Sequence, residues 1–189
     1  MLKGVIAMSK SKAEQRLGMI FVSNEGYKFF IKDYVDARNV TVKFMDEYGA
    51  EVHTQWQNCK KGKVKNPYFR SVYGVGCIGE GEFLTGTDGR PTREYVLWRG
   101  MLDRCYSGRY ATYDNVTVCD RWLCYANFLE DLPLIENYEL WLNGEERISL
   151  DKDLKQVGEE NKVYSLDTVK FITVSENTKE AMQRKWSKQ

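Results

Sequence analysis

The stretch that decides the fold of this chain is ISLDKDLKQVGEENKVYSLDTVKFITVSEN, residues 148–177. It opens with two aspartates, Asp151 and Asp153, that flank Lys152 in an otherwise apolar run. A second short apolar run, residues 171–173, is followed by Glu176 and Asn177. Carboxylate and amide oxygens are ligands that Mg²⁺ accepts. Two interpretations are open at this point: a metal site for cutting a phosphodiester, or a charged strand end in which Lys152 pairs with either aspartate.

The composition predicts a folded protein that stays out of membranes. Of the 189 residues 42% are hydrophobic and 13% aromatic, which is enough for a packed core. No run approaches the roughly 20 apolar residues of a membrane span, and the apolar part of the N-terminus is too short for a signal peptide. We therefore expect an intracellular, cytoplasmic protein.

The five cysteines predict neither disulfides nor a zinc site. Their number is odd, and no C-x-x-C pair occurs. Buried free thiols are the expected state.

Charge is distributed unevenly, although the net charge is only +1. Residues 60–70 contain five bases and no acid: Lys60, Lys61, Lys63, Lys65 and Arg70. Residues 130–146 contain six acids and no base: Glu130, Asp131, Glu136, Glu139, Glu145 and Glu146. Such separation could turn one face of the protein toward phosphate. A basic loop that only contacts solvent is the alternative interpretation of residues 60–70.

The first 80 residues read as an arm and a small β-rich module. Residues 1–25 lack a clear period and are expected to form an N-terminal arm. From residue 26 to 80, alternating apolar residues predict strands, with a hairpin turn at 46–49 and a lysine-containing loop after it.

Two amphipathic helices are predicted in the second part, residues 81–189. The first covers residues 91–106, with Pro91 in its first turn. The second covers residues 119–132 and ends at Pro133. Their aromatic side chains are expected in the core. The predicted class is therefore α+β.

Three segments in this order resemble a known group of proteins. EYVLWRGMLDRCYS (94–107), TYDNVTVCDRWLCYANFLEDL (112–132) and the stretch 148–177 resemble phage and mobile-element proteins related to HNH endonucleases. The resemblance covers about half of the chain, from Glu94 to Ala181, and residues 39–79 look like the small N-terminal module of some phage members.

The resemblance implies a ββα-metal module. Residues 149–153 would form its first strand, 161–169 the turn, 171–173 the second strand, and Glu176 and Asn177 the start of the helix. It also implies a hydrolase acting on DNA, an endonuclease or nickase of the homing-endonuclease kind, with one Mg²⁺ held by Asp151, Asp153, Glu176 and Asn177. Asp151 and Lys152 would be the catalytic residues.

The chain departs from the family pattern at the base. The family has a histidine where this chain has Lys152, and the only histidine, His53, lies in the N-terminal hairpin. Lysine, with an unperturbed pKa near 10.4, is protonated at neutral pH. Neighbouring aspartates favour its charged form further. The usual base is therefore missing.

Three functions remain open from the sequence. The first is a Mg²⁺-dependent DNA endonuclease. The second is a DNA-binding phage regulator or counter-defence factor with weakened catalysis, contacting phosphates through the bases of residues 60–70 together with Arg99 and Arg104 of the first helix. The third is an inhibitor that binds a host protein through the acidic stretch 130–146.

Overall fold

The computed structural model describes residues 11–144 and 148–186, and the chain divides into two units. The N-terminal unit ends at Phe69, and the C-terminal unit begins at Arg70. Each unit has a hydrophobic core of its own. Strands and helices occur in both, so the predicted α+β class is confirmed.

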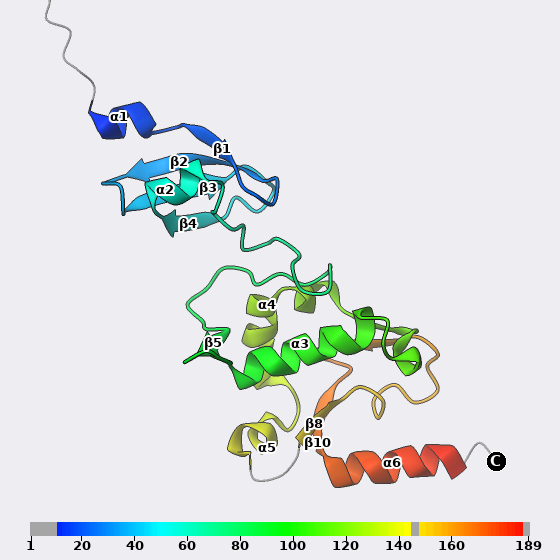
Figure 1. The fold of residues 1–189 in the computed structure, drawn as a ribbon. Helices are drawn as coiled ribbons and strands as arrows, with labels where there is room; N and C mark the ends of the chain where they lie inside the picture. Colours follow the sequence, from blue (N-terminus) through cyan, green and yellow to red (C-terminus); the bar gives the residue numbers. More distant parts are fainter. Residues whose placement is uncertain (1–10, 145–147, 187–189) are drawn as a thin grey trace, which may run out of the picture. The chain divides into compact units, whose positions relative to one another are not determined.

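A four-stranded antiparallel sheet in the order β1-β2-β3-β4 forms the N-terminal unit (Figure 1). Its elements are α1 (Lys12–Arg16), β1 (Ile20–Val22), β2 (Lys28–Tyr34), β3 (Val40–Phe44), β4 (Glu51–Thr54) and α2 (Trp56–Lys60). In β3 the residues Val40, Val42 and Phe44 are buried, so alternate side chains face the core. The predicted hairpin is confirmed as β3 and β4.

The predicted arm is wrong for its last residues. β1 pairs with β2 from Ile20 opposite Phe30 to Val22 opposite Lys28. Phe21 explains the pairing, because its ring stacks on Phe29 with centroids 5.9 Å apart. Residues 1–10 of the arm lie outside the described residues.

The boundary between the units lies after Phe69 and not after residue 80. Residues 70–80 belong to the C-terminal unit because their backbone is bonded to it. The Cys77 amide donates to the Leu123 carbonyl at 2.9 Å, and the Cys77 carbonyl accepts from Tyr125 at 2.9 Å. These partners are far apart in sequence, which is why the pattern of residues did not reveal them.

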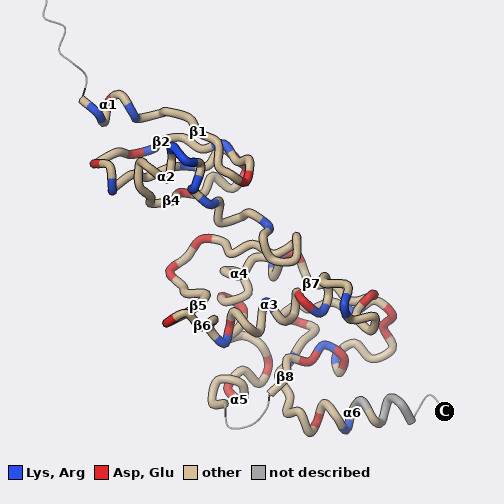
Figure 2. The backbone as a smooth tube through the Cα atoms, in the orientation of Figure 1, with Lys and Arg blue, Asp and Glu red and all other residues tan. Residues whose placement is uncertain are grey.

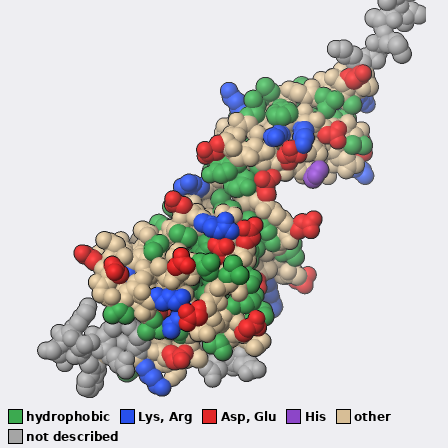
Figure 3. Space-filling view, turned by 180° about the vertical axis from the view of Figure 1, so that it is seen from behind, with side chains coloured by type: hydrophobic (Ala, Val, Ile, Leu, Met, Phe, Trp, Pro, Cys, Tyr) green, Lys and Arg blue, Asp and Glu red, His purple; other side chains and the backbone are tan. Residues whose placement is uncertain are grey.

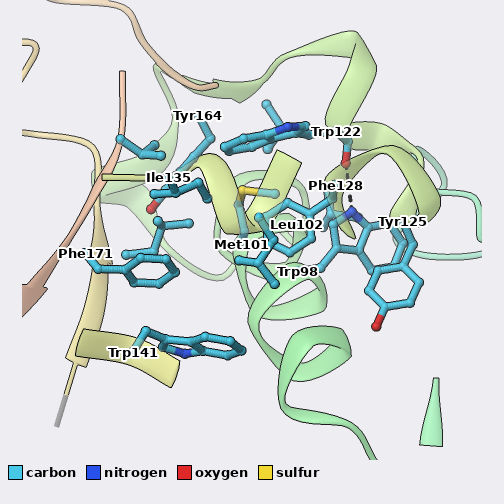
Figure 4. Close-up of a cluster of buried hydrophobic side chains, with 14 of the residues drawn as sticks. Trp98, Met101, Leu102, Trp122, Tyr125, Phe128, Ile135, Trp141, Tyr164 and Phe171 are labelled. Carbon is cyan, nitrogen blue, oxygen red and sulfur yellow. Dashed lines mark hydrogen bonds between the residues drawn. The ribbon is translucent and has the colours of Figure 1, made fainter. Parts of the chain in front are cut away.

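The C-terminal unit is built around one long helix, α3 (Arg93–Tyr106). Trp98, Met101 and Leu102 of α3 are fully buried, and the Trp98 indole nitrogen donates to the Trp122 carbonyl at 2.7 Å (Figure 4). The other elements are β5 (Gly86–Thr87), β6 (Arg90–Pro91), η1 (Ala111–Tyr113), β7 (Val116–Val118), η2 (Asp120–Leu123), α4 (Tyr125–Asp131), η3 (Leu132–Leu134), α5 (Tyr138–Asn143), β8 (Ile148–Asp151), β9 (Lys162–Tyr164), β10 (Lys170–Thr173) and α6 (Val174–Trp186).

Both predicted helices form, with corrections. α3 begins at Arg93 and not at Pro91, because Thr92 is its N-cap and Pro91 lies in β6. The second helix is broken into η2, α4 and η3, and Pro133 lies inside η3 rather than ending α4. The break falls at Cys124, whose backbone is extended because it forms a β-bridge with Cys77.

The two expected strands and the helix of the stretch 148–177 form with other bounds. β8 ends at Asp151, so Lys152 and Asp153 lie outside the strand, and α6 begins at Val174. β8 and β10 are antiparallel, with Asp151 opposite Lys170 and Ile148 opposite Thr173. α6 follows directly and contacts both strands. The expected turn at 161–169 contains an additional strand, β9, which pairs in parallel with β7. Within the described part of the chain, no helix is long and apolar enough to cross a membrane.

Candidate functional site

Asp151 ends β8 as a buried carboxylate of which only one oxygen is occupied. Its Oδ2 accepts hydrogen bonds from the backbone amides of Asp153 at 3.0 Å and Leu154 at 2.9 Å. These two bonds fix the orientation of the carboxylate. No hydrogen bond to another described residue involves Oδ1, so this oxygen is available to a ligand.

Lys152 is engaged by an acid and by an aromatic ring. Its side chain is 7% exposed, and Nζ donates to Asp153 Oδ1 at 3.0 Å. Nζ also lies 4.7 Å from the centroid of the Tyr113 ring, a cation–π contact. The Lys152 amino group is therefore already engaged by Asp153 and by the Tyr113 ring.

Asp153 is occupied by two lysines. Its Oδ1 also accepts from Lys162 Nζ at 2.5 Å. Burial alone would raise the pKa of Asp153, but the bonds to Lys162 and Lys152 outweigh it and lower this pKa to about 2. The carboxylate is therefore charged at neutral pH, and its Oδ1 is already engaged by both lysines.

Glu176 is used as a helix cap. Its Oε2 accepts from the Thr173 amide at 2.9 Å and from Thr173 Oγ1 at 2.9 Å, while Thr173 Oγ1 accepts from the Glu176 amide at 3.1 Å. This is a capping box at the start of α6. The bonds from Thr173 lower the pKa of Glu176.

Asn177 lies in the first turn of α6 and is half-buried. The side-chain amide of Asn177 makes no hydrogen bond to any other described residue. Of the four predicted metal ligands, Asp151 and Asn177 thus keep free oxygen donors, whereas Asp153 and Glu176 are engaged. Over residues 11–144 and 148–186, no three His, Cys, Asp or Glu side chains gather closely enough to hold a metal ion.

An open recess of about 810 Å³ adjoins Lys152 and Asp153. Tyr113, Asn115, Glu160 and Lys162 are among its other lining residues. Acids and bases both face it, so its charges largely cancel. The recess is polar, but it lacks the excess of positive charge that would mark it as a phosphate site.

Four lysines form a second candidate site in the N-terminal unit. Lys60 ends α2, and Lys61, Lys63 and Lys65 follow it (Figure 2). We call these four residues the lysine row. All four are exposed, whereas the residues between the last three are buried. No described residue forms an ion pair with any of them.

The residues between the lysines fix the loop in place. The Gly62 carbonyl accepts from the Asn24 amide at 2.8 Å, and Val64 is buried in the core. Asn66, which is also buried, donates from Nδ2 to Asp46 Oδ2 at 2.6 Å and from its amide to Glu25 Oε2 at 3.1 Å. The lysine row therefore projects from an ordered backbone.

The three predicted DNA-contacting arginines differ in their surroundings. Arg70 and Arg99 are exposed, and each lacks an ion-pair partner among the residues described. Arg104 instead lies 5.9 Å from the centroids of the Tyr113 and Tyr164 rings, with its Nε buried. Arg104 is thus half-buried against these rings, and its contact with DNA stays a prediction.

Most of the described acids in the stretch 130–146 are neutralised. Glu130 and Asp131 pair with Arg121 at 2.7 and 2.8 Å, and Glu136 pairs with Lys155 at 2.9 Å. Glu145 and Glu146 lie outside the described residues. The described part of this stretch does not form the continuous acidic surface that a mimic of nucleic acid needs.

His53 is placed as a surface residue of the N-terminal unit (Figure 3). Its Nδ1 lies 3.0 Å from Thr41 Oγ1 on the neighbouring strand. His53 belongs to β4, in the predicted N-terminal hairpin, and is exposed.

Sequence reasoning missed two aromatic residues, Tyr48 and Tyr68. Their rings stack with centroids 4.2 Å apart. Asn66, which follows Lys65 of the lysine row, is hydrogen-bonded both to Asp46 in the turn of Tyr48 and to the Tyr68 amide. The sequence does contain a signal: Tyr48 lies between Glu47 and Gly49 in a polar turn, where a buried aromatic residue is not expected. Comparisons with known proteins add no name to these sites: no family model, no curated protein and no solved structure matches the chain.

Proposed function

We propose that this chain is a cytoplasmic DNA-binding protein of the HNH-like group that contacts the phosphate backbone through the lysine row. The observation that carries the proposal is the row itself: four exposed lysines without ion-pair partners among the described residues, on a loop whose alternate residues are buried. Arg70 and Arg99 are proposed as further contacts. Binding without cleavage suits a phage regulator or counter-defence factor.

Phosphate contacts of this kind predict a definite dependence on salt. Each phosphate neutralised on duplex DNA contributes about 0.9 to the slope of log affinity against log salt concentration. Four lysines therefore predict a slope of about −3.6. Because lysine contacts with phosphate carry no sequence information, affinity should depend little on sequence.

The test is duplex binding at several salt concentrations with two charge-matched variants. Substituting Lys61, Lys63 and Lys65 by alanine should weaken binding and make the slope shallower by about 2.7. The control replaces three exposed lysines outside the row, Lys12, Lys28 and Lys179, and should change the slope far less. Wild-type binding that does not respond to salt, or two variants that respond alike, would refute the proposal.

A second candidate function is a Mg²⁺-dependent DNA endonuclease or nickase. The observation behind it is that Asp151 Oδ1 and the Asn177 side chain make no hydrogen bond to a described residue. Asp151 pairs with Lys170, at the other end of the strand pair from Thr173 and the start of α6. Two protein oxygens suffice for Mg²⁺, which usually keeps several waters. The bound ion would supply stabilisation of negative charge on the leaving oxygen. Asp151 would hold the ion with a carboxylate whose orientation is fixed by its two hydrogen bonds from backbone amides. Lys152 would contribute positive charge near the phosphate and would not act as the base.

Conversion of supercoiled plasmid in Mg²⁺ and in Mn²⁺ tests this candidate. Wild type should nick or linearise the plasmid, Asp151→Asn and Asn177→Ala should not, and Glu176→Gln should remain active because glutamine preserves the capping box. A plasmid that is shifted on the gel but never cut would eliminate the nuclease and leave DNA binding in place.

A further inference from the structure

The stacked pair Tyr48 and Tyr68 exposes an aromatic face beside the lysine row. The two rings are nearly parallel, with an angle of 12° between their planes. Tyr48 is 53% exposed. Tyr68 supports Tyr48 from one side, which leaves the other side of Tyr48 open to solvent.

Hydrogen bonds hold this pair in a fixed position relative to the lysines. Asn66 donates to Asp46 in the turn that carries Tyr48, and Asn66 Oδ1 accepts from the Tyr68 amide at 2.9 Å. Asn66 directly follows Lys65. One buried side chain therefore joins the end of the lysine row to both tyrosines.

The local charge favours a nucleic acid over a protein partner with basic side chains. Two of the nearby acids, Asp46 and Glu25, accept hydrogen bonds from Asn66 and so face the loop. The third, Glu47, is exposed next to Tyr48, and the four lysines outnumber it. The four lysines of the row face solvent. An aromatic face next to a row of cations is the combination that binds single strands, in which bases stack while phosphates meet positive charge.

We infer that Tyr48 is a stacking site for an unpaired base of single-stranded DNA whose phosphates run along the lysine row. This inference rests on the proposed DNA binding and adds which form of DNA the N-terminal unit prefers. In a duplex the bases already stack on one another, so the face of Tyr48 would gain nothing there. Stacking accepts any base, because every base has an aromatic face.

The experiment compares three DNA ligands of about twelve nucleotides, a length within the usual site size of such proteins. They are a single strand, the same strand with abasic sites at its centre, and a duplex. Tyr48→Leu keeps apolar contact with Tyr68 but removes the ring. It should bind the intact strand about tenfold more weakly, should bind the duplex as wild type does, and should no longer distinguish the intact strand from the abasic one.

Three controls separate stacking from charge and from misfolding. Tyr48→Phe keeps the ring and should bind like wild type, and Tyr110→Leu removes an exposed tyrosine of the C-terminal unit and should also bind normally. The triple lysine variant should weaken binding to all three ligands. Unchanged melting temperatures would show that the variants are folded.

The outcomes distinguish this inference from the function on which it rests. Wild-type protein that binds all three ligands with equal affinity, or Tyr48→Leu that still distinguishes intact from abasic strands, would overturn stacking at Tyr48 and leave DNA binding intact. Wild-type protein that binds none of the ligands would refute the proposed function itself.

Discussion

At the scale of single residues, one carboxylate shows how the charged end of β8 is stabilised. Asp153 carries two lysines, and its pKa is lowered from 3.8 to about 2. Because the folded-state pKa lies below the unfolded one, this contribution to stability is complete above about pH 4. It is lost as the pH falls towards 2.

Asp153→Asn should therefore lower the free energy of unfolding at pH 7 by about 2 kcal/mol. Denaturant unfolding from pH 7 to pH 2 should show the variant losing less stability on acidification than wild type. Asp167→Asn, which changes an exposed aspartate of the same unit, is the matched control and should behave like wild type. Parallel acid curves for Asp153→Asn and wild type would contradict the assignment.

Half of this arrangement could be predicted from the sequence. Lys152 adjoins both aspartates in the chain, and an ion pair with one of them was one of the two interpretations that the sequence left open. Asp153 is the partner. Lys162 could not be predicted, because β9 brings it to Asp153 by pairing in parallel with β7. Parallel pairing joins distant segments and leaves no local pattern.

At the scale of elements, the capping box at the start of α6 predicts how substitutions of Thr173 and Glu176 change stability. Thr173→Ala removes one side of the capping box and should lower the free energy of unfolding by about 1 kcal/mol. Glu176→Gln retains the hydrogen bonds and should leave stability nearly unchanged. Thr178→Ala, which affects a side chain one turn further along α6, is the control. Thermal unfolding of the three variants measures the difference.

Two glycines around α3 should respond to alanine in opposite directions. A Cβ at Gly76 would lie 2.5 Å from Leu102 Cδ1 and 3.1 Å from the Trp98 ring, both of them core side chains. Gly76→Ala should destabilise the protein by about 1–3 kcal/mol. A Cβ at Gly100, inside α3, meets only Arg104 Nη1 at 3.7 Å.

Gly100→Ala should accordingly stabilise the protein by about 0.5–1 kcal/mol, because alanine loses less backbone entropy in a helix. Denaturant midpoints of the two variants, compared with wild type, check both signs. A destabilised Gly100→Ala protein would show that this face of α3 has less room than the contacts indicate.

The helices also show what the sequence can predict at this scale. The apolar spacing from Tyr95 to Cys105 is uninterrupted, and α3 follows it. The spacing from Trp122 to Leu132 is equally helical, yet Cys124 leaves the helical conformation to pair with Cys77. The contact with Cys77 overrides the local helical periodicity at Cys124, and the residues around Cys124 contain no pattern that predicts this contact.

At the scale of the whole molecule, two separate cores predict two separate responses to core mutations. Phe44 is buried in the N-terminal core and Phe128 in the C-terminal core. Phe44→Ala should cost about 3–5 kcal/mol and unfold the N-terminal unit first. Trp98 and Trp122, buried in the other core, should keep their native fluorescence at that point.

Phe128→Ala should produce the reverse order, with the fluorescence of Trp98 and Trp122 lost before that of Trp56, which packs against the N-terminal core. Limited proteolysis at rising temperature, followed by mass spectrometry of the fragments, would identify which unit is cut. A single transition for both variants, at the same temperature and for both units, would show that the cores unfold together.

In the loop that carries the lysine row, exposed and buried residues alternate, and this alternation affects how the protein can change during evolution. Residues 61, 63 and 65 face solvent, whereas Gly62, Val64 and Asn66 hold the loop to the sheet. Replacing an exposed lysine alters attraction to a polyanion without touching the packing beneath it. Mutation can therefore adjust the strength of binding in small steps, while the fold that presents the charges is inherited unchanged.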